Sequence, residues 1–217
     1  MTDDDTRTEL AVLIEELNEN AVLDLVHRRL EAGDDPLVII AEAEAGMRLV
    51  GKRHEQGEYF IAGLIMAGHI FGEVMELTLP LVEPRSNGEV VGTVLVGTVQ
   101  GDIHDLGKSI LGLLLRTEGF KVYDLGVDVP PERFLAKVLE LRPDIVGLSG
   151  LLTQAYDSMK KTISLLRIAT TDWPKPLPII IGGNQLDEQV RVYVGADYWT
   201  NEALDGVRIC QKLMKQS

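Results

Sequence analysis

The chain has 217 residues, of which 45% are apolar, and its 34 acidic and 21 basic residues give a formal net charge of −13. The apolar share supports a packed core and excludes disorder for most of the chain, while the acidic balance argues against nucleic acids and anionic membranes, which bind basic surfaces. The acidic start does not resemble a targeting peptide, and no uninterrupted apolar run approaches the roughly 20 residues that span a bilayer, which predicts a cytoplasmic protein.

The first 85 residues show the spacing of amphipathic helices. Gly33 would end the second helix, and Asp35 followed by Pro36 is typical of a capping residue and a first helical turn. We expect Val38 to face inward on the third helix and His69 to pack within the fourth. Short connections favour a small antiparallel four-helix bundle as the domain of residues 1–85. The predicted helices cover residues 10–17, 22–30, 36–55 and 60–79.

After a polar stretch at residues 83–89, which predicts a linker, β-rich runs alternate five times with helical patterns. This alternation is typical of a parallel sheet covered by helices on both faces. We therefore predict an α/β fold class, in which the four-helix bundle is followed by a flavodoxin-like or Rossmann-like five-stranded parallel sheet domain at residues 90–217. Ligands of such sheets bind beyond the carboxyl ends of the strands, so the loops after Val99, Ser149 and Ile181 are of most interest. The predicted strands cover residues 90–99, 121–125, 144–149, 178–181 and 197–200, and the predicted helices cover residues 106–118, 130–141, 155–169, 186–194 and 203–214.

The loop after the first strand lacks the glycine-rich turn that binds nucleotides and carries His104 between two aspartates. A neutral imidazole is a good transition-metal ligand, and Asp102 could accept a hydrogen bond from its other ring nitrogen. Asp105 lies nearer the helix start, where carboxylates stabilise exposed N–H groups. Taken alone, this pattern is more typical of an exposed histidine beside two capping aspartates.

Three motifs at the predicted strand ends together resemble the cobalamin-binding domain shared by methionine synthase, corrinoid proteins of methyltransferase systems and B12-dependent mutases. Each motif alone is weak, but all three occur in the order of that family, and the resemblance covers residues 90–217. The motifs are Asp102-x-His104-x-x-Gly107, Ser149-Gly150-Leu151 and Gly182-Gly183.

The resemblance implies cobalamin as the cofactor, with its dimethylbenzimidazole tail displaced from cobalt and buried in the domain. It makes His104 the axial cobalt ligand and Asp102 its hydrogen-bond partner, and it marks these two residues as catalytic. It places Ser149 and, as a weaker candidate, Thr153 against the tail base, and it leaves room for the tail at the glycine pair. The cofactor-binding residues that it implies in this domain are Gly101, Asp102, Ile103, His104, Asp105, Gly107, Ser149, Leu151, Thr153, Gly182 and Gly183.

One position departs from methionine synthase, in which a second serine extends the relay from histidine to aspartate. That position is Ala155 here. The relay would therefore end at Asp102, or continue through water or Thr153. This departure disfavours methionine synthase itself, and it leaves the cobalamin prediction intact.

The segment Gly57-Glu58-Tyr59-Phe60-Ile61 and the apolar helix after it resemble the cap of methionine synthase and of corrinoid proteins in methanol, methylamine and aryl-ether demethylation systems. The resemblance implies that cap side chains cover the upper face of the corrin and shield the methyl group. Phe60 and Leu64 are the first candidates for this contact, followed by Ile61, Met66 and Ala67.

Together these resemblances imply a corrinoid methyl carrier. Co(I) would take a methyl group from a donor-specific methyltransferase, and the resulting methylcobalamin would pass it to tetrahydrofolate or a thiol on an acceptor methyltransferase. A reductive activase is a further implied partner, whereas nucleic acid and membrane are not expected. No acid or base for activating the donor stands out in the sequence, so we expect a non-catalytic subunit of a methyltransferase system.

Two other functions share the same loop motifs. A cobalamin subunit of a B12-dependent mutase normally docks on a barrel and lacks a four-helix cap. A cobalamin-sensing regulatory module also joins a bundle to this domain, but it carries basic DNA-binding helices that the acidic first 35 residues do not match. A preference for methyl- or adenosyl-cobalamin would distinguish these alternatives.

Overall fold

The computed structural model describes residues 8–82 and 90–215. It divides into two compact units, Met1–Glu83 and Pro84–Ser217. The linker predicted at residues 83–89 lies outside the described residues.

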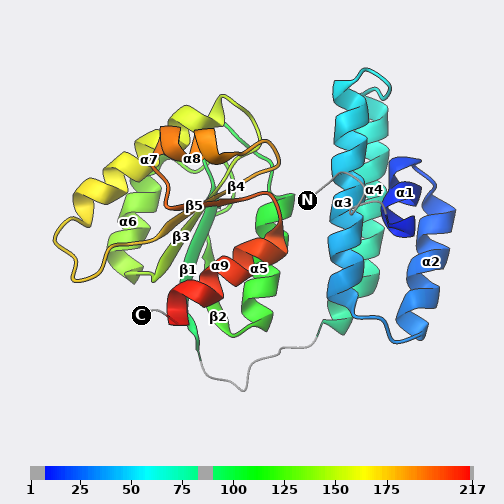
Figure 1. The fold of residues 1–217 in the computed structure, drawn as a ribbon, viewed down its shortest axis with the longest axis horizontal. Coiled ribbons are helices and arrows are strands. Elements are labelled where there is room, and N and C mark those ends of the chain that lie inside the picture. Colours follow the sequence, from blue (N-terminus) through cyan, green and yellow to red (C-terminus); the bar gives the residue numbers. More distant parts are fainter. Residues whose placement is uncertain (1–7, 83–89, 216–217) are drawn as a thin grey trace. The chain divides into compact units, whose positions relative to one another are not determined.

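The first unit contains four α-helices and a 3-10 turn within residues 8–82 (Figure 1). The side chains of Thr8, Asn18 and Asp35 each accept a hydrogen bond from a backbone N–H in the first turn of the helix that follows. These bonds satisfy N–H groups that have no partner inside a helix, and they confirm Asp35 and Pro36 as the start of the third helix. The elements are α1 (Glu9–Glu15), α2 (Glu19–Glu31), α3 (Pro36–Glu55), α4 (Ile61–Thr78) and η1 (Leu79–Leu81).

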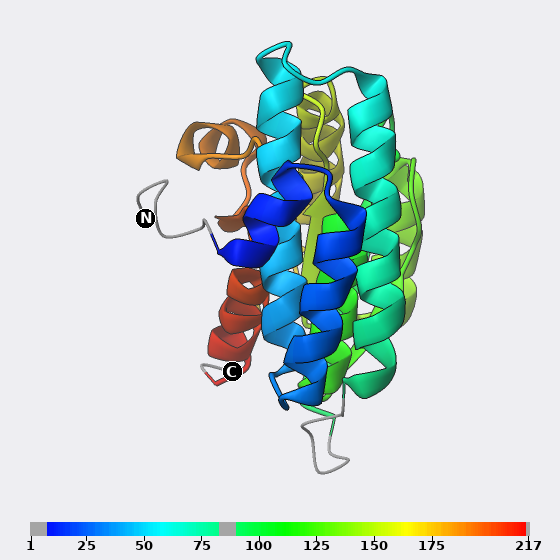
Figure 2. The ribbon, with the colours of Figure 1, turned by 90° about the vertical axis from the view of Figure 1, so that its right-hand side faces the viewer.

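The long helices α3 and α4 form a pair, with α1 packed against α3 and α2 against α4 (Figure 2). Two inward positions predicted from the sequence are wrong. Val38 is 47% exposed, because its apolar neighbours Leu37 and Ile39 already occupy the inward side of the first turn of α3. His69 is exposed and lies beside Glu73 on the outer side of α4, whereas Ala67, Ile70, Phe71 and Val74 fill the bundle core.

Among the described residues, the segment Ile61–Leu81 is long and apolar enough to cross a membrane by length and composition alone, with a mean hydropathy of 1.3. No span was predicted there from the sequence, because Glu73 and Glu76 interrupt the apolar run. A single such helix is weak evidence for a membrane span, since the core helix of a bundle meets the same criteria.

The second unit is an α/β domain whose described residues contain one sheet of five parallel strands, in the order β2-β1-β3-β4-β5. Helices α5 and α9 cover one face of this sheet, and α6, α7 and α8 cover the other (Figure 1). The predicted fold class is therefore confirmed. The strands are β1 (Gly92–Thr98), β2 (Phe120–Asp124), β3 (Ile145–Ser149), β4 (Ile179–Gly182) and β5 (Tyr198–Thr200), and the helices are α5 (Leu106–Thr117), α6 (Pro131–Leu141), α7 (Ala155–Ala169), α8 (Glu188–Val194) and α9 (Ala203–Lys215).

The apolar runs of the sequence account for these elements. The interior strands β1, β3 and β4 are buried on both faces, so they read as continuous apolar segments. Pro131 stands in the first turn of α6, where its missing N–H costs nothing. Cys210 on α9 is 1% exposed and behaves as a small apolar core residue.

The register of the sheet aligns one row of residues at the carboxyl ends of four strands. Thr98 pairs with Ser149, Ser149 with Gly182, and Gly182 with Thr200. The strand order reverses between β1 and β3, which is the place where open α/β sheets form a ligand crevice. The loop that carries His104 follows β1 and therefore begins at this point.

Candidate functional site

The loop after β1 buries Asp102 and leaves His104 half exposed. The turn begins with Gly101, whose φ of 87° suits a residue without a Cβ, and the Asp102 N–H closes it on the Val99 carbonyl at 3.2 Å. Asp102 is 1% exposed, whereas the His104 side chain is 50% exposed. The loop therefore holds its carboxylate inside the domain and presents its imidazole at the surface.

His104 is bound by Asp102 in a way that fixes the state of its ring. The ring Nδ1 lies 2.6 Å from Asp102 Oδ1, and the His104 backbone N–H donates to the same oxygen at 3.0 Å. An ionised carboxylate only accepts, so Nδ1 carries a proton, and in the neutral ring Nε2 then holds the lone pair. This is the tautomer in which a half-exposed histidine can bind a metal through Nε2.

The second oxygen of the Asp102 carboxylate is bound to the loop after β3. Asp102 Oδ2 accepts the N–H groups of Leu151 at 2.6 Å and Leu152 at 2.9 Å. The sequence predicts that the relay ends at Asp102 or continues through water or Thr153. In the structure Thr153 is exposed, and two backbone N–H groups occupy this oxygen.

These contacts also set the charge of Asp102. Burial raises the pKa of its carboxyl group, but hydrogen bonds from the backbone of Leu152, from the backbone and ring of His104, and from the backbone of Leu151 together lower it by more. The pKa of Asp102 therefore lies below its ordinary value, and the residue stays an acceptor for the His104 ring.

Two further contacts at this end of the sheet were not predicted from the sequence. The Thr98 hydroxyl donates to the His104 carbonyl at 3.1 Å from a fully buried position. Lys108 is buried on α5 and forms an ion pair with Asp124 at the end of β2. The sequence offered two signs of the ion pair, a lysine directly after Gly107 and an acidic residue at the carboxyl end of the second strand. The three motifs do not include this strand end.

Asp105 does not cap α5 as its position predicts, and its part in cofactor binding stays a prediction. It stands at the position before α5, yet its side chain accepts no capping hydrogen bond from the described residues. Asp105 is exposed, and the helix start is instead fixed by the Ser109 N–H, which donates to the Asp105 carbonyl at 2.8 Å.

The glycines at the carboxyl ends of the strands differ in how much space surrounds them, and so in why a glycine stands at each position. A Cβ at Gly101 or Gly107 would meet nothing within 4 Å in the described part of the chain, so the space beside His104 is open. A Cβ at Gly183 would lie 2.0 Å from the Gly150 carbonyl oxygen, which requires glycine there regardless of any ligand. At Gly182 the nearest such atom is the Thr200 carbonyl oxygen at 3.8 Å, an ordinary contact.

Exposed apolar side chains also occur at this end of the sheet. Ile103, next to His104 in the chain, is 73% exposed, and Leu106 at the start of α5, Val127 after β2 and Leu152 after β3 are each more than a third exposed. Ser149 lies at the end of β3, in the row that links it to Thr98 and Gly182. The residues predicted to bind the cofactor in this unit thus lie together at the carboxyl ends of the strands.

The predicted cap residues belong to the first unit and differ in exposure. Phe60 is 81% exposed on a turn that is held in place, since the neighbouring Tyr59 hydroxyl donates to the Glu15 carbonyl at 2.8 Å. Leu64 is half-buried and Ala67 is fully buried in the bundle, so Ala67 has no surface to offer a ligand. Ile61 and Ile65 are each 68% exposed, and Ile65 was not among the residues named from the sequence.

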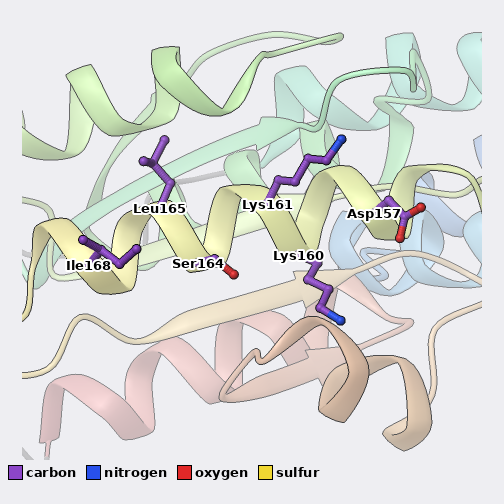
Figure 3. A pocket seen from close by; sticks show the side chains of 6 residues that line it. All are labelled: Asp157, Lys160, Lys161, Ser164, Leu165 and Ile168. Carbon is purple, nitrogen blue, oxygen red and sulfur yellow. The ribbon is translucent and has the colours of Figure 1, made fainter.

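A separate hollow of about 460 Å³ lies on the outer side of α7 (Figure 3). Two of its polar side chains already have partners, because Lys160 lies over the Tyr193 ring at 4.1 Å and the Tyr193 hydroxyl donates to Asp157 at 2.7 Å. It includes none of the predicted site residues. The lining residues are Asp157, Lys160, Lys161, Ser164, Leu165 and Ile168.

Comparison with known proteins agrees with this geometry. Residues 92–208 match the family model described as the B12 binding domain, and residues 6–78 match a second family model of the same description. Trimethylamine corrinoid protein 1 of Methanosarcina acetivorans is 34% identical over 197 residues, which cover 89% of this chain and 90% of that protein.

Two solved structures extend the comparison. The monomethylamine corrinoid protein of Methanosarcina barkeri is 24% identical and shares the fold with a TM-score of 0.82, over 98% of this chain and all of that chain. The methanol:cobalamin methyltransferase complex of Methanosarcina barkeri contains a chain that is 26% identical with a TM-score of 0.53, over 100% of this chain and 82% of that one.

A doubly wound sheet with a histidine loop at its switch point, preceded by a helical bundle, defines a cofactor-binding protein. The chain belongs to the B12-binding family of corrinoid proteins. The predictions of the family and of cobalamin as its cofactor are confirmed.

Proposed function

We propose that this chain is a methyl carrier that binds cobalamin with the nucleotide tail displaced and His104 as the lower cobalt ligand. The observation that carries the proposal is the half-exposed His104 ring, whose Nδ1 is held by Asp102 at 2.6 Å, which leaves Nε2 of the neutral ring as the nitrogen that can bind a metal. When bound, the cofactor would supply a cobalt centre for methyl transfer, which His104 and Asp102 would hold in place.

The residues around His104 fit a large planar ring. Open space beside Gly101 and Gly107 lets such a ring approach the start of α5, and the exposed side chains of Ile103, Leu106 and Leu152 offer it an apolar surface. Burying these side chains under a macrocycle would remove apolar area from water and favour binding.

The tail would lie near the row formed by Thr98, Ser149 and Gly182. Gly182 tolerates a Cβ within the protein alone, so a requirement for glycine at that position would come from the ligand. Gly183 has a structural reason of its own, and its presence adds little to the argument for a tail site.

The first turns of α4 would form the cap over the upper face. Phe60, Ile61, Ile65 and Met66 expose apolar side chains there. Gly68 and Gly72 continue the face of Ile61 and Ile65 without side chains, because residues spaced by three and four lie together on a helix. These residues would exclude water from the reacting methyl group and would have to move aside for each transfer.

The implied partners are a donor-specific methyltransferase, an acceptor methyltransferase that uses tetrahydrofolate or a thiol, and a reductive activase. Support for the first comes from relatives with trimethylamine and monomethylamine in their names and from the methanol:cobalamin methyltransferase complex. The site residues described above would hold the cobalamin, and none of them indicates which methyl donor is used.

Reconstitution followed by a transfer assay tests this proposal. The full chain, loaded with cobalamin and reduced, should take a methyl group from methanol or a methylamine when the matching donor methyltransferase is added. Methylcobalamin should bind at least as well as adenosylcobalamin. Strong preference for adenosylcobalamin, together with no transfer from any donor enzyme, would favour a mutase subunit instead.

A further inference from the structure

We infer that Asp128, in the turn between β2 and α6, is a positioning residue that fixes the backbone of the His104 loop for cobalt coordination. The inference rests on the proposed function, because it concerns how that ligand is held. Asp128 lies outside the three motifs of the sequence, and its side chain reaches neither His104 nor Asp102.

Asp128 holds the loop at two backbone groups. The Gly101 N–H donates to Asp128 Oδ1 at 2.8 Å, and the Asp128 N–H donates to the Asp102 carbonyl at 3.0 Å. These two bonds lie on either side of the peptide that joins Gly101 to Asp102. They fix the orientation of this peptide, and with it the direction in which the Asp102 side chain leaves the backbone.

The turn that carries Asp128 is anchored independently of the His104 loop. The Val129 N–H donates to the Thr98 carbonyl at 3.0 Å, and the Thr98 N–H donates to the Gly126 carbonyl at 2.9 Å. Asp128 itself has a φ of 51°, a left-handed conformation that aspartate and asparagine adopt more readily than most residues. The turn is thus a fixed support, and the histidine loop is bound to it.

This support matters because Asp102 must satisfy several donors at once. Its Oδ1 accepts from His104, and its Oδ2 accepts from Leu151 and Leu152 in a different loop. A small rotation of the Asp102 backbone would break one set of bonds or the other. Asp128 therefore acts on His104 through Asp102, at a distance from the cobalt position.

The role of Asp128 is geometric. Its carboxylate is exposed, so water screens its charge, and the bond to Gly101 uses one side-chain oxygen. Asparagine offers the same oxygen and tolerates the same backbone conformation. Glycine keeps the conformation and the backbone N–H but removes the acceptor, so Asp128→Asn and Asp128→Gly separate the acceptor from the backbone shape.

Asp144 provides a matched control in the same unit. Its carboxylate accepts the Thr93 N–H at 2.7 Å and its own N–H donates to the Thr93 carbonyl at 2.9 Å. This reciprocal pair stands at the amino-terminal edge of the sheet, opposite the site. Asp144→Gly removes a comparable bond without touching the His104 loop.

The test measures the full-length chain with and without Co(II) cobalamin. Without cofactor, hydrogen exchange at the Gly101 amide should be about tenfold faster in Asp128→Gly, and unchanged in Asp128→Asn and Asp144→Gly. With cofactor, the affinity of Asp128→Gly should fall about tenfold, as is usual for residues that orient a metal ligand. The fraction of cobalt bound to a histidine nitrogen, read from the electron paramagnetic resonance spectrum, should fall as well.

Several results would overturn the inference. The first is an Asp128→Gly variant whose affinity for cobalamin and histidine-bound fraction equal those of the wild type. The second is an Asp144→Gly variant that loses as much of both as Asp128→Gly does. The third is an Asp128→Asn variant that does not keep the wild-type affinity and histidine-bound fraction. A wild-type chain whose cobalt carries no histidine nitrogen would instead refute the proposed function, so the two failures are distinguishable.

Discussion

The two regions that we propose for cofactor binding, the His104 loop and the first turns of α4, are built by different means. The loop is held by hydrogen bonds, since its buried aspartate receives backbone N–H groups from two loops and the imidazole is fixed in one tautomer. At the start of α4, Phe60 on the preceding turn and Ile65 on the helix expose apolar side chains, whose contacts lack the directional geometry of hydrogen bonds.

The difference matches two different tasks. A metal ligand needs a fixed position and a fixed proton, and hydrogen bonds supply both. A cover that opens and closes needs contacts that form and break without leaving polar groups unpaired, and apolar side chains supply those. Substitutions in the loop should therefore have large, specific effects, and substitutions on α4 should have small, additive ones.

The largest effect is expected for His104→Ala. The chain should still hold some corrinoid through the apolar surface and the tail, but its spectrum should lose the histidine-bound form, and affinity should fall by at least the roughly 10–100-fold seen when groups behind a ligand are removed. Equilibrium binding followed by absorption spectroscopy measures both. His27→Ala, an exposed histidine of α2, is the control and should leave binding unchanged.

Asp102→Asn should come next and should act before any cofactor is added. The amide NH2 would face N–H donors of His104 or Leu151, and the unpaired buried groups should destabilise the chain by about 1–3 kcal/mol. The amide could also favour the other ring tautomer, in which Nε2 carries the proton. Denaturant unfolding, and the ring nitrogen shifts in the nuclear magnetic resonance spectrum, measure these two effects.

The same variant has a defined pH dependence. The folded pKa of Asp102 lies below its ordinary value, so the carboxylate contributes stability above the unfolded pKa of about 3.9 and loses it as pH falls through the folded pKa. The stability difference between wild type and Asp102→Asn should therefore be constant near neutral pH and shrink below about pH 4. A difference that grows in acid would contradict this account.

Gly107→Ala should have opposite effects on the chain and on the cofactor. A Cβ there meets nothing within 4 Å in the described residues, so alanine should stabilise the chain without cofactor by about 0.4–1 kcal/mol. It should nevertheless weaken cobalamin binding several-fold, because the added Cβ would occupy the space in which we propose that the corrin ring lies. Gly51→Ala, on α3 with equally open surroundings, should stabilise the chain and leave binding unchanged.

The smallest effect is expected for Ile65→Ser on the cap. It should leave the histidine-bound spectrum intact, cost stability less than about 0.5 kcal/mol as an exposed position, and speed loss of the methyl group to water a few-fold. Ile168→Ser, on a 76% exposed isoleucine of α7, is the matched control. Equal rates of methyl loss in the two variants would remove Ile65 from the cap.

Features encoded in neighbouring residues could be predicted from the sequence. The alternation of strands and helices, the Asp35 and Pro36 start of α3, and the place of His104 after β1 all follow from local patterns. The two wrong inward positions, Val38 and His69, arise where several apolar residues compete for one helix face and only tertiary packing decides between them.

The remaining features of the site depend on contacts between distant segments. The N–H groups of Leu151 and Leu152 reach Asp102 across about fifty positions of sequence, and a backbone donor has no signature in residue identity. Asp105 looked like a helix cap and does not act as one. Gly183 belonged to a recognised motif, yet only the structure shows the Gly150 carbonyl that excludes a side chain there.

The identity of the lower cobalt ligand can be measured directly by electron paramagnetic resonance of the chain loaded with Co(II) cobalamin. The protein is produced with nitrogen-15 histidine, while the cofactor keeps natural nitrogen. If His104 Nε2 binds cobalt, the splitting from the axial nitrogen should change from a triplet to a doublet, and His104→Ala should abolish it. A triplet that persists in the labelled protein would show that the benzimidazole of the cofactor stays on the metal, which contradicts the account.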